Sequence, residues 1–394
     1  MPPRHFLVVG AGMFGVTTAL SLRRRGHAVT LADPGPLPHP LAASTDISKV
    51  LRMEYGPDET YMAMMEEAFE GWRRWARTWT GAGRENLYHE TGVLMVTREP
   101  MRAGGFEHDS WETLRKRGHA PVRMTADALA ERFPAWSTRR YVDGFFHVLG
   151  GYAESGRVVA RLLEDARAAG VALVERRLRD FDYAGARIIG ITDEPGDRHP
   201  ADHVILAAGA WTGKLLGFDH EIRATGHPVL HLRPDDPAPF TPDRFPVFTA
   251  DVARTGLYGF PLNRDGVVKV ALHDPGHPID PDTPRIVTPE QVDRFRALLA
   301  DTFPALADAE IVSSRLCLYA DTQDEDFWIA PHPDHEGLTV ASGGSGHGFK
   351  FAPMLGDLIA DIAEGKPNAR AEKFRWRPEV RMARGQEAAR YHGD

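Results

Sequence analysis

Residues 343–351, GGSGHGFKF, place four glycines beside one histidine and one lysine, directly after the apolar stretch LTVAS. Glycines let a backbone approach a ligand closely, and His347 and Lys350 can donate hydrogen bonds or carry positive charge. A second glycine cluster, VVGAGMFG, lies at residues 8–15. We interpret the two segments as parts of one binding site; a purely structural turn is the alternative interpretation of residues 343–351.

Gly10, Gly12 and Gly15 form the pattern G-x-G-x-x-G between an apolar stretch and a helical stretch. In a strand–turn–helix unit, the first glycine allows the tight turn, the second admits a pyrophosphate, and the third permits close helix–strand packing. Phosphate charge is favoured at the N-terminus of that helix. Asp33 ends the next apolar stretch, where a carboxylate can accept a hydrogen bond from a ribose hydroxyl. The pattern predicts dinucleotide binding and fits the adenosine of either FAD or NAD.

Hydrophobic spacing predicts the elements that must position these residues. Residues 5–33 are expected to form a strand, a helix and a second strand, with Gly26 ending the helix. Helices are expected at 58–79 and 154–169, and a buried strand that enters another glycine turn is expected at 203–211.

Residues 218–285 differ in character, because many prolines separate short β-like stretches, and they predict a mostly antiparallel sheet. A helix is expected to follow, with Thr288 as its cap, Pro289 in its first turn and Gln291 completing a capping box.

The composition excludes several classes of protein. A net charge of -8 over 394 residues argues against a nucleic-acid partner or an anionic membrane surface. No apolar run approaches the roughly 18 residues of a membrane span. Cys317 is the single cysteine, so an intrachain disulfide is impossible and a reducing, cytoplasmic location is expected. The histidine-containing stretches HDPGHPIDPD and PHPDHE match no standard zinc or iron spacing, and no metal is expected.

Cys317 lies between Leu316 and Leu318 and allows two interpretations. Free cysteines usually behave as small buried hydrophobes. The functional alternative is a thiolate that attaches a cofactor covalently, and composition leaves both interpretations open.

Three segments carry a family resemblance: STDISKVLRMEYG, CLYADTQDEDFWIAPHP and LTVASGGSGHGFKFAPMLGDLIADIAEGK. Together with the N-terminal glycine unit they resemble the monomeric sarcosine oxidase family, part of the D-amino-acid-oxidase-like superfamily. That family also includes N-methyltryptophan, fructosyl amino acid, pipecolate and saccharopine oxidases. The resemblance runs from the first strand to about Lys366.

The resemblance implies FAD as cofactor, often held by a thioether to a cysteine in the position of Cys317. It implies hydride transfer from the α C–H or N-alkyl C–H of a secondary amino acid to flavin N5. Reoxidation by O2 would give H2O2, and the imine product would hydrolyse. The implied partners are therefore an amino-acid substrate and O2, and a monomeric protein is expected.

The resemblance also implies roles for individual residues. Arg52 and Lys350 match a cationic pair that binds the substrate carboxylate, and Lys269 matches a lysine over flavin N5 that activates oxygen. Tyr258 and His273 match pocket residues that position the amine. The alternatives are surface positions for Arg52 and Lys350, and an outward-facing position on an edge strand for Lys269.

The remaining implied roles concern the edge of the flavin ring. Tyr319 would share a strand face with Cys317 and line the pocket. The glycines at 343–348 and the helix start beyond Phe351 would face the pyrimidine end of the flavin, where negative charge develops.

One departure bears on the substrate. Sarcosine-type members commonly have arginine at the position of Lys49, whereas STDISKVLR and RATGHPVLHL resemble the fructosyl amino acid and saccharopine branch. Asp46 then becomes a polar neighbour of the flavin, and larger N-substituted amino acids become the expected substrates. A dehydrogenase of the same fold that uses another acceptor, and a flavoprotein without catalysis, are the competing hypotheses.

The expected architecture is α/β, α+β overall, with a Rossmann-like FAD-binding domain built from residues 1–90, 145–217 and 315–380. An antiparallel β-rich substrate domain, residues 91–144 and 218–314, is inserted into it, and residues 381–394 form a C-terminal tail. The residues assigned to the cofactor are Gly10, Gly12, Met13, Phe14, Gly15, Asp33, Asp46, Lys49, Ala208, Gly209, Cys317, Gly344, Gly346, His347, Gly348 and Lys350. The residues assigned to catalysis are Arg52, Tyr258, Lys269, His273, Tyr319, His347 and Lys350.

Overall fold

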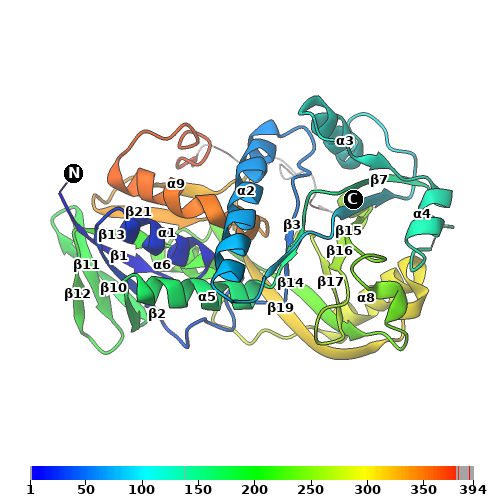
Figure 1. Cartoon of the computed structure of the whole chain (residues 1–394). Helices are drawn as coiled ribbons and strands as arrows, with labels where there is room; N and C mark the ends of the chain where they lie inside the picture. Colours follow the sequence, from blue (N-terminus) through cyan, green and yellow to red (C-terminus); the bar gives the residue numbers. More distant parts are fainter. Residues whose placement is uncertain (1, 138, 379, 381–389, 391–394) are drawn as a thin grey trace. The chain divides into compact units, whose positions relative to one another are not determined.

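A computed structural model of the chain describes residues 2–137, 139–378, 380 and 390 (Figure 1). The backbone divides into two compact units. Unit 1 comprises Met1–Lys49, Glu154–Thr225 and Leu318–Gln386, and unit 2 comprises Val50–Ala153, Gly226–Cys317 and Glu387–Asp394. Residues 50–90, 145–153 and 315–317, which the prediction groups with the FAD-binding segments, lie in unit 2, and residues 218–225, predicted for the substrate domain, lie in unit 1. The functions of the two domains stay predictions, and the predicted tail lies outside the described residues except for Arg390.

Unit 1 is built on a largely parallel sheet. The strands of unit 1 are β1 (His5–Val9), β2 (Ala28–Asp33), β9 (Ala172–Glu175), β10 (Leu178–Ala184), β11 (Arg187–Asp193), β12 (Arg198–Pro200), β13 (His203–Leu206), β20 (Trp328–Pro331) and β21 (Leu338–Ser342). Its helices are α1 (Met13–Arg24), α5 (Ser155–Ala168), η1 (Gly209–Trp211), α6 (Thr212–Leu216), η4 (Gly348–Phe351) and α9 (Ala352–Glu364). The sheet order is β20-β21-β13-β1-β2-β9, and only the β20–β21 pair among these is antiparallel. The predicted strand–helix–strand unit is confirmed, with Gly26 at φ +89° after the helix.

Strand alternation divides the apolar side chains of this sheet between two layers. Helix α1 packs against both α5 and α9 (Figure 1). A Cβ on Gly356 of α9 would lie 2.2 Å from the carbonyl oxygen of Thr17, so glycine permits this close helix contact. On the other face, Leu7 and Val9 of β1 join a core with Ile188 and Ile191 of the antiparallel β10–β11–β12 sheet.

Unit 2 contains a larger mixed sheet with helices against it. The strands of unit 2 are β4 (Tyr88–His89), β5 (Val93–Thr97), β6 (Val122–Arg123), β7 (Asp143–His147), β8 (Gly151–Ala153), β15 (Val247–Ala250), β16 (Leu257–Phe260), β17 (Val268–Leu272) and β18 (His277–Pro278). Its helices are α2 (Glu59–Gly81), α3 (Phe106–Lys116), α4 (Ala126–Arg132), η2 (Ala238–Phe240), α7 (Val252–Thr255), α8 (Pro289–Thr302) and η3 (Pro304–Leu306). Strands β3 (Lys49–Leu51), β14 (Ile222–Arg233) and β19 (Glu310–Thr322) contain the positions where one unit ends and the other begins.

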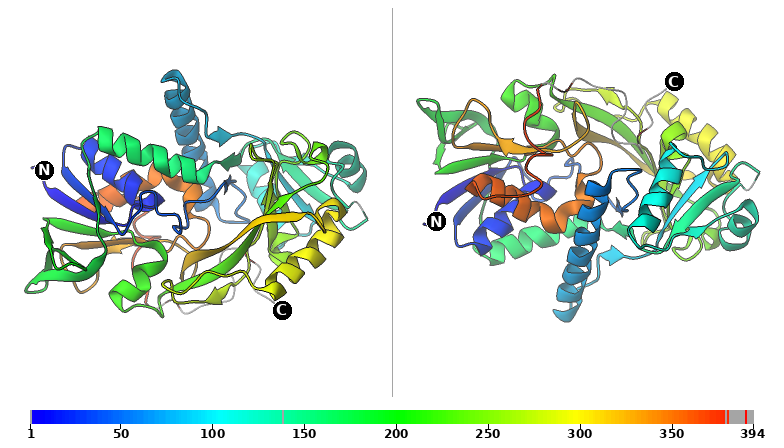
Figure 2. Two further views of the ribbon diagram at one scale, coloured as in Figure 1. Left: turned by 90° about the horizontal axis from the view of Figure 1, so that it is seen from below. Right: turned by 90° about the horizontal axis from the view of Figure 1, so that it is seen from above.

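The large sheet of unit 2 runs in the order β18-β14-β17-β16-β15-β5-β7-β6, with β19 paired to β14. Neighbouring strands from β14 to β15 are antiparallel, as predicted for residues 218–285, whereas β15 pairs with β5 in parallel. Helix α8 covers one face of this sheet (Figure 2), where Phe295, Leu299 and Phe303 join Phe248 in the main core.

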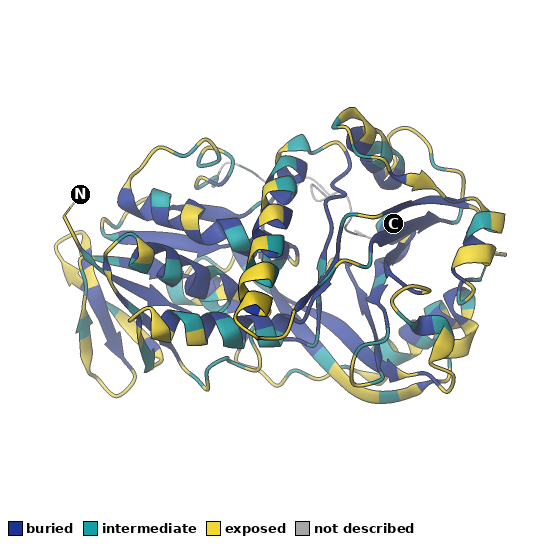
Figure 3. Cartoon of the chain, viewed as in Figure 1, coloured by how far each residue is buried: buried dark blue, intermediate teal, exposed yellow. Residues whose placement is uncertain are grey.

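Polar side chains cap two helix starts in unit 2. Asp58 caps α2 by accepting hydrogen bonds from the backbone of Thr60 and Tyr61. The capping box at Thr288 and Gln291 is confirmed at the start of α8. Figure 3 shows α2 with an exposed side and a buried side, as its apolar spacing predicts. The mixed parallel and antiparallel sheets confirm the predicted fold class.

Candidate functional site

The first glycine turn of unit 1 connects β1 to α1. A Cβ on Gly15 would lie 1.8 Å from the carbonyl oxygen of Gly10, and a Cβ on Gly10 would lie 2.3 Å from that of Ala207. Side chains at either position would therefore clash with backbone. Gly12 differs, because its Cβ would meet only the Ser44 hydroxyl at 3.4 Å. The packing of the protein itself does not require glycine at residue 12.

Asp33 lies at the same edge of the sheet, at the carboxyl end of β2. Its Oδ2 accepts a hydrogen bond from the backbone N–H of Ala11 at 2.8 Å, and its Oδ1 accepts one from Gly35 at 3.1 Å. A carboxylate oxygen has further lone pairs, so a ribose hydroxyl can still donate to this residue. Ala208 and Gly209 follow β13, which pairs in parallel with β1, so they reach the same edge of the sheet.

Asp46 and Lys49 belong to a segment that is fixed by the start of α5. The main-chain oxygen of Asp46 accepts hydrogen bonds from Ser155 Oγ and from the Gly156 N–H, each at 2.8 Å. The Asp46 side chain accepts a bond from the Ile47 N–H at 2.7 Å, and Lys49 Nζ lies 4.0 Å from Asp46 Oδ2. The same segment reaches the glycine turn through Ser44, whose Oγ accepts from the Met13 N–H at 3.3 Å. Sequence reasoning missed Ser44 and Ser155, since neither serine has a recognisable local signal.

The second glycine segment returns to the first at Phe14. A Cβ on Gly348 would lie 2.8 Å from the Phe14 ring, and one on Gly344 would lie 3.7 Å from it. Gly346, at φ +78°, is covered by the Tyr319 ring, which a Cβ would approach to 2.2 Å. The structure therefore brings the two predicted glycine clusters together within unit 1, at the side chain of Phe14.

His347 is held firmly in this segment. Its Nε2 donates to the carbonyl oxygen of Glu325 at 3.0 Å, and its ring stacks on Phe327 with centroids 4.9 Å apart. Lys350 lies in η4, directly before α9, and is only 2% exposed. The surface alternative for Lys350 is therefore wrong.

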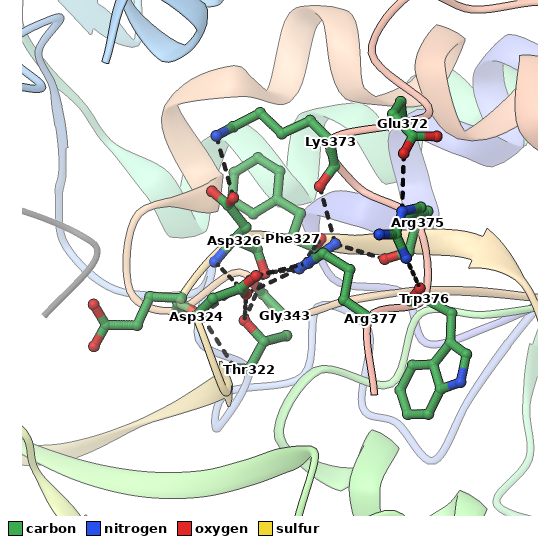
Figure 4. Close-up of polar contacts among 12 residues, drawn as sticks. Thr322, Asp324, Asp326, Phe327, Gly343, Glu372, Lys373, Arg375, Trp376 and Arg377 are labelled. Atoms are coloured by element: carbon green, nitrogen blue, oxygen red, sulfur yellow. Dashed lines mark hydrogen bonds and ion pairs between the residues drawn. The ribbon is translucent and has the colours of Figure 1, made fainter. Parts of the chain in front are cut away.

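The loop that carries Glu325 and Phe327 is tied to the end of unit 1 by Arg377, a residue that sequence reasoning missed. Figure 4 shows Arg377 reaching Asp324 with two hydrogen bonds, at 2.7 and 2.9 Å, and the carbonyl oxygen of Phe327 at 3.2 Å. Charge-assisted bidentate pairs of this kind are among the strongest hydrogen bonds in proteins. They fix the loop that supports His347.

Lys269 lies inside unit 2, on β17 between β14 and β16. Val268, Val270 and Leu272 point into the core below α8, so Lys269 points to the opposite face of the sheet. Its Nζ lies 4.6 Å from the centre of the Phe260 ring, and the residue is 1% exposed. The edge-strand alternative is therefore wrong, because β17 is an interior strand and the ammonium group is buried.

Tyr258 and His273 lie on the same strand pair as Lys269. Tyr258 is half-buried, pairs in register with Ala271, and has its ring 5.9 Å from Phe260 and 6.4 Å from His273. The structure thus groups three of the predicted catalytic residues, Tyr258, Lys269 and His273, around β16 and β17.

Arg52 is buried elsewhere in unit 2, in the irregular segment before α2. Its guanidinium lies 5.2 Å from the ring centre of Tyr55 and 5.6 Å from that of Phe106. It also donates a hydrogen bond to the carbonyl oxygen of Glu54. The surface alternative for Arg52 is therefore wrong as well.

Cys317 is buried on β19, at the chain position where unit 2 ends. Its electrostatic surroundings include Arg285. Burial and the charge of Arg315 lower the pKa of Arg285 to about 10, while Cys317 and Asp282 act in the opposite direction.

Two further features bear on the class of protein. In the described ranges, no group of three or more histidine, cysteine or acidic side chains could hold a metal ion. No helix of the part that the structure describes has both the length and the apolar character needed to cross a membrane.

Comparison with known proteins connects these features. The profile of the family described as DAO, FAD dependent oxidoreductase, matches residues 5–362. The chain belongs to this family. This FAD-dependent oxidoreductase is 28% identical to the monomeric sarcosine oxidase of Bacillus sp. (strain B-0618), over 91% of this chain and 92% of that protein. It is also 28% identical to the L-saccharopine oxidase of Schizosaccharomyces pombe, over 95% of this chain and 93% of that protein.

Among solved structures, the fructosyl amine:oxygen oxidoreductase (amadoriase I) of Aspergillus fumigatus matches the FAD-dependent oxidoreductase described here with a TM-score of 0.82 and 27% identity. The match covers 99% of this chain and 94% of that chain. Both the fold and the FAD dependence predicted from the sequence are therefore confirmed.

The glycines of unit 1 fit the cofactor of this family. Gly10 and Gly15 are dictated by the protein's own backbone, but Gly12 and Gly344 would tolerate a Cβ as far as their neighbours are concerned. At these two positions the missing side chain leaves space beside a helix start, as binding of pyrophosphate or of a flavin edge requires.

Proposed function

We propose that the protein is an FAD-dependent oxidase of secondary amines, acting on N-substituted amino acids. The observation that carries the proposal is the burial of cations among aromatic side chains: Arg52 and Lys269 in unit 2, and Lys350 in unit 1. Guanidinium and ammonium groups are the side chains that bind carboxylates, and their burial strengthens such a charge-assisted contact. The names of the relatives, which are oxidases of sarcosine and of saccharopine, point to the same chemistry.

The bound FAD would accept two electrons from a C–H bond next to the amine nitrogen and pass them to O2, which yields H2O2. In this proposal Arg52 and Lys350 bind the substrate carboxylate, Arg52 with a planar pair of donors and Lys350 as a point charge. Tyr258 and His273 orient the amine, and Tyr319 lines the pocket. Lys269 supplies a fixed positive charge where oxygen is reduced, which favours the negative charge that oxygen acquires.

The structure before α9 supports a further part of the proposal. Backbone N–H groups of the glycine segment, η4 and the first turn of α9 would stabilise negative charge on the cofactor, since a helix N-terminus carries partial positive charge. His347 would contribute by holding this segment in place through Glu325 and Phe327.

We further propose that Cys317 attaches the FAD through a thioether. The Cys317→Ala protein should release its flavin on acid denaturation, whereas the flavin of the unaltered protein should stay with the precipitated chain. Absorbance of the supernatant measures the difference. Flavin that stays bound in the Cys317→Ala protein, or that leaves the unaltered protein, would refute the linkage.

The second candidate function is the oxidation of amino acids whose N-substituent is larger than methyl. It is favoured by Lys49 and the sequence STDISKVLR, and by the similarity to the fructosyl amine:oxygen oxidoreductase. The proposal also includes a monomeric, cytoplasmic enzyme, and light scattering after size exclusion tests the first of these statements.

The decisive experiment mixes the purified protein anaerobically with sarcosine, N-methyltryptophan, pipecolate, saccharopine and fructosyl-glycine. Loss of the flavin's visible absorbance identifies a substrate, and H2O2 formed on admitting air identifies an oxidase. Loss of colour without peroxide would favour a dehydrogenase, and no loss with any compound would overturn the proposed function.

A further inference from the structure

A buried glutamate–histidine pair lies in unit 2, and none of the roles assigned above uses it. His147, the last residue of β7, donates from Nδ1 to Glu54 Oε1 at 2.9 Å. The Glu54 side chain is 0% exposed and that of His147 is 1% exposed. Because removing such groups from water is costly, the pair persists only where its members satisfy one another.

Glu54 is an anion in this site. Burial disfavours its charge, but the hydrogen bond and charge of His147, together with the charge of Arg52, hold the pKa of Glu54 below its ordinary value. Its second oxygen, Oε2, has no hydrogen-bond partner among the described residues. The hydrogen bond to His147 is therefore what fixes the side chain of Glu54.

The pair is linked to Arg52 through the backbone. Arg52 donates from Nη1 to the main-chain carbonyl oxygen of Glu54, the residue whose side chain is tied to β7. Residues 52–55 form no regular helix or strand, so tertiary contacts must fix their path. One such contact is the bond from the Gly56 N–H to Ser110 Oγ of α3 at 2.8 Å, and the Glu54–His147 bond is another.

We propose that the Glu54–His147 pair is a positioning device that holds Arg52 in the orientation that receives the substrate carboxylate. The inference rests on the proposed role of Arg52. In this proposal the length of the Glu54 side chain is what matters. The side chain reaches His147 and so fixes the main-chain carbonyl oxygen of Glu54, which accepts the hydrogen bond from the Arg52 guanidinium.

Two substitutions of Glu54 distinguish the effect of its side-chain length from the effect of its charge. Glu54→Gln keeps the length of the side chain and can still accept the bond from His147, and it removes a negative charge that attracts Arg52. It should therefore bind a carboxylate at least as tightly as the unaltered protein does. Glu54→Asp keeps the charge but is one methylene shorter, so it should weaken carboxylate binding about tenfold, since small misplacements of a binding group carry large costs. The probe is propionate, titrated against the FAD-loaded protein while the flavin's visible spectrum reports the Kd.

Three controls complete the test. Propionamide, which lacks the charge, should bind all variants equally. Glu364→Asp is the matched variant, because Glu364 bonds another buried histidine, His27 of unit 1, at 3.0 Å and should leave the Kd unchanged. In an Arg52→Met background, Glu54→Asp should have no further effect on propionate binding.

The outcomes are distinguishable. Equal or undetectable propionate binding by the unaltered protein and by Arg52→Met would overturn the role of Arg52 itself. Loss of binding in Arg52→Met, with Glu54→Asp unchanged or with Glu54→Gln as weak as Glu54→Asp, would overturn only the positioning role.

Discussion

The glycine turn of unit 1 and the β16–β17 strand pair of unit 2 are subject to different physical constraints. The turn depends on atoms that are absent, because a Cβ on Gly15 would lie 1.8 Å from a backbone oxygen. The strand pair depends on a charge that is present, because Lys269 places an ammonium group 4.6 Å from the Phe260 ring centre in a buried face. The first constraint is steric and local; the second is electrostatic and depends on which strands pair.

This difference teaches where function resides in each unit. Steric constraints tolerate no substitution, so errors at the turn should abolish the folded, cofactor-binding state. A buried cation is a burden on stability that a catalytic role can offset, so its removal should leave the fold intact and damage one step.

The largest expected effect is that of Gly15→Ala, which forces backbone atoms apart. We expect loss of soluble, FAD-binding protein, as measured by the ratio of flavin to protein absorbance after purification. Gly12→Ala meets only Ser44 Oγ at 3.4 Å, so the FAD-free protein should keep its Tm and lose affinity for FAD instead.

Gly81→Ala, at the end of α2, is the control, because nothing lies within 4 Å of the added Cβ. A Gly15→Ala protein with normal flavin content would contradict the claim that steric constraints require glycine at residue 15.

Lys269→Met tests the role of the buried positive charge in unit 2. Reoxidation of the reduced enzyme by O2 should slow by about 100-fold, the order expected when a preorganised charge is removed. Anaerobic reduction by substrate should change much less. Stopped-flow absorbance measures both half-reactions.

Lys214→Met, on α6 at the surface of unit 1, is the matched control and should leave both rates unchanged. Equal slowing of both half-reactions by Lys269→Met would contradict the proposed role.

The same contrast explains what the sequence could predict. The strand–glycine–helix unit and the Thr288–Gln291 capping box depend on neighbours within a few residues, and both are confirmed. The sequence leaves the side that Lys269 faces open, because strand alternation alone also permits an outward-facing lysine on an edge strand. The positions of neighbouring strands decide it.

Long-range pairings had no local signal either. The parallel pairing of β15 with β5 joins stretches far apart in sequence, as does the Glu54–His147 bond between residues 93 positions apart. Neither motif nor spacing in the sequence connects Glu54 to His147. The roles of the cofactor and catalytic residues stay predictions, and the experiments above test them.

The charged groups behind the two sites extend the comparison to stability. In unit 1, Glu364 of α9 bonds His27 at 3.0 Å, Arg25 at 2.5 Å and Lys366 at 2.9 Å. Burial disfavours its charge, but these three partners together lower its pKa to about 2. The folded state therefore binds a proton less readily than the unfolded chain, and this part of the stability is present above about pH 4.5 and is lost as the pH falls toward 2.

Glu364→Gln should cost about 2 kcal/mol of unfolding free energy at pH 7 and less at pH 3, because it removes the anion that pairs with the partly buried Arg25 and with Lys366. Urea denaturation at the two pH values measures the change. Asp219→Asn, on an exposed turn of unit 1, is the control. An equal loss at both pH values would show that packing, and not charge, is responsible.

Glu107 of α3, in unit 2, should show the opposite sign and the smallest effect. Burial, with the nearby charge of Asp251, raises the pKa of Glu107 to about 7, and its Oε1 has no hydrogen-bond partner within the described ranges. The folded state then holds a proton that the unfolded chain gives up near pH 4.5, so the contribution is present below that pH and is lost as the pH rises to about 7. Glu107→Gln mimics the protonated form, and it should add about 1 to 2 kcal/mol at pH 8 and nothing at pH 4. Hydrogen exchange resolved by peptide should confine that gain to unit 2, because the carboxyl group and Asp251 both belong to it. A Glu107→Gln protein that is destabilised at pH 8 would mean that the charged form is the one the fold requires, and the contrast in sign between the two units would then fail.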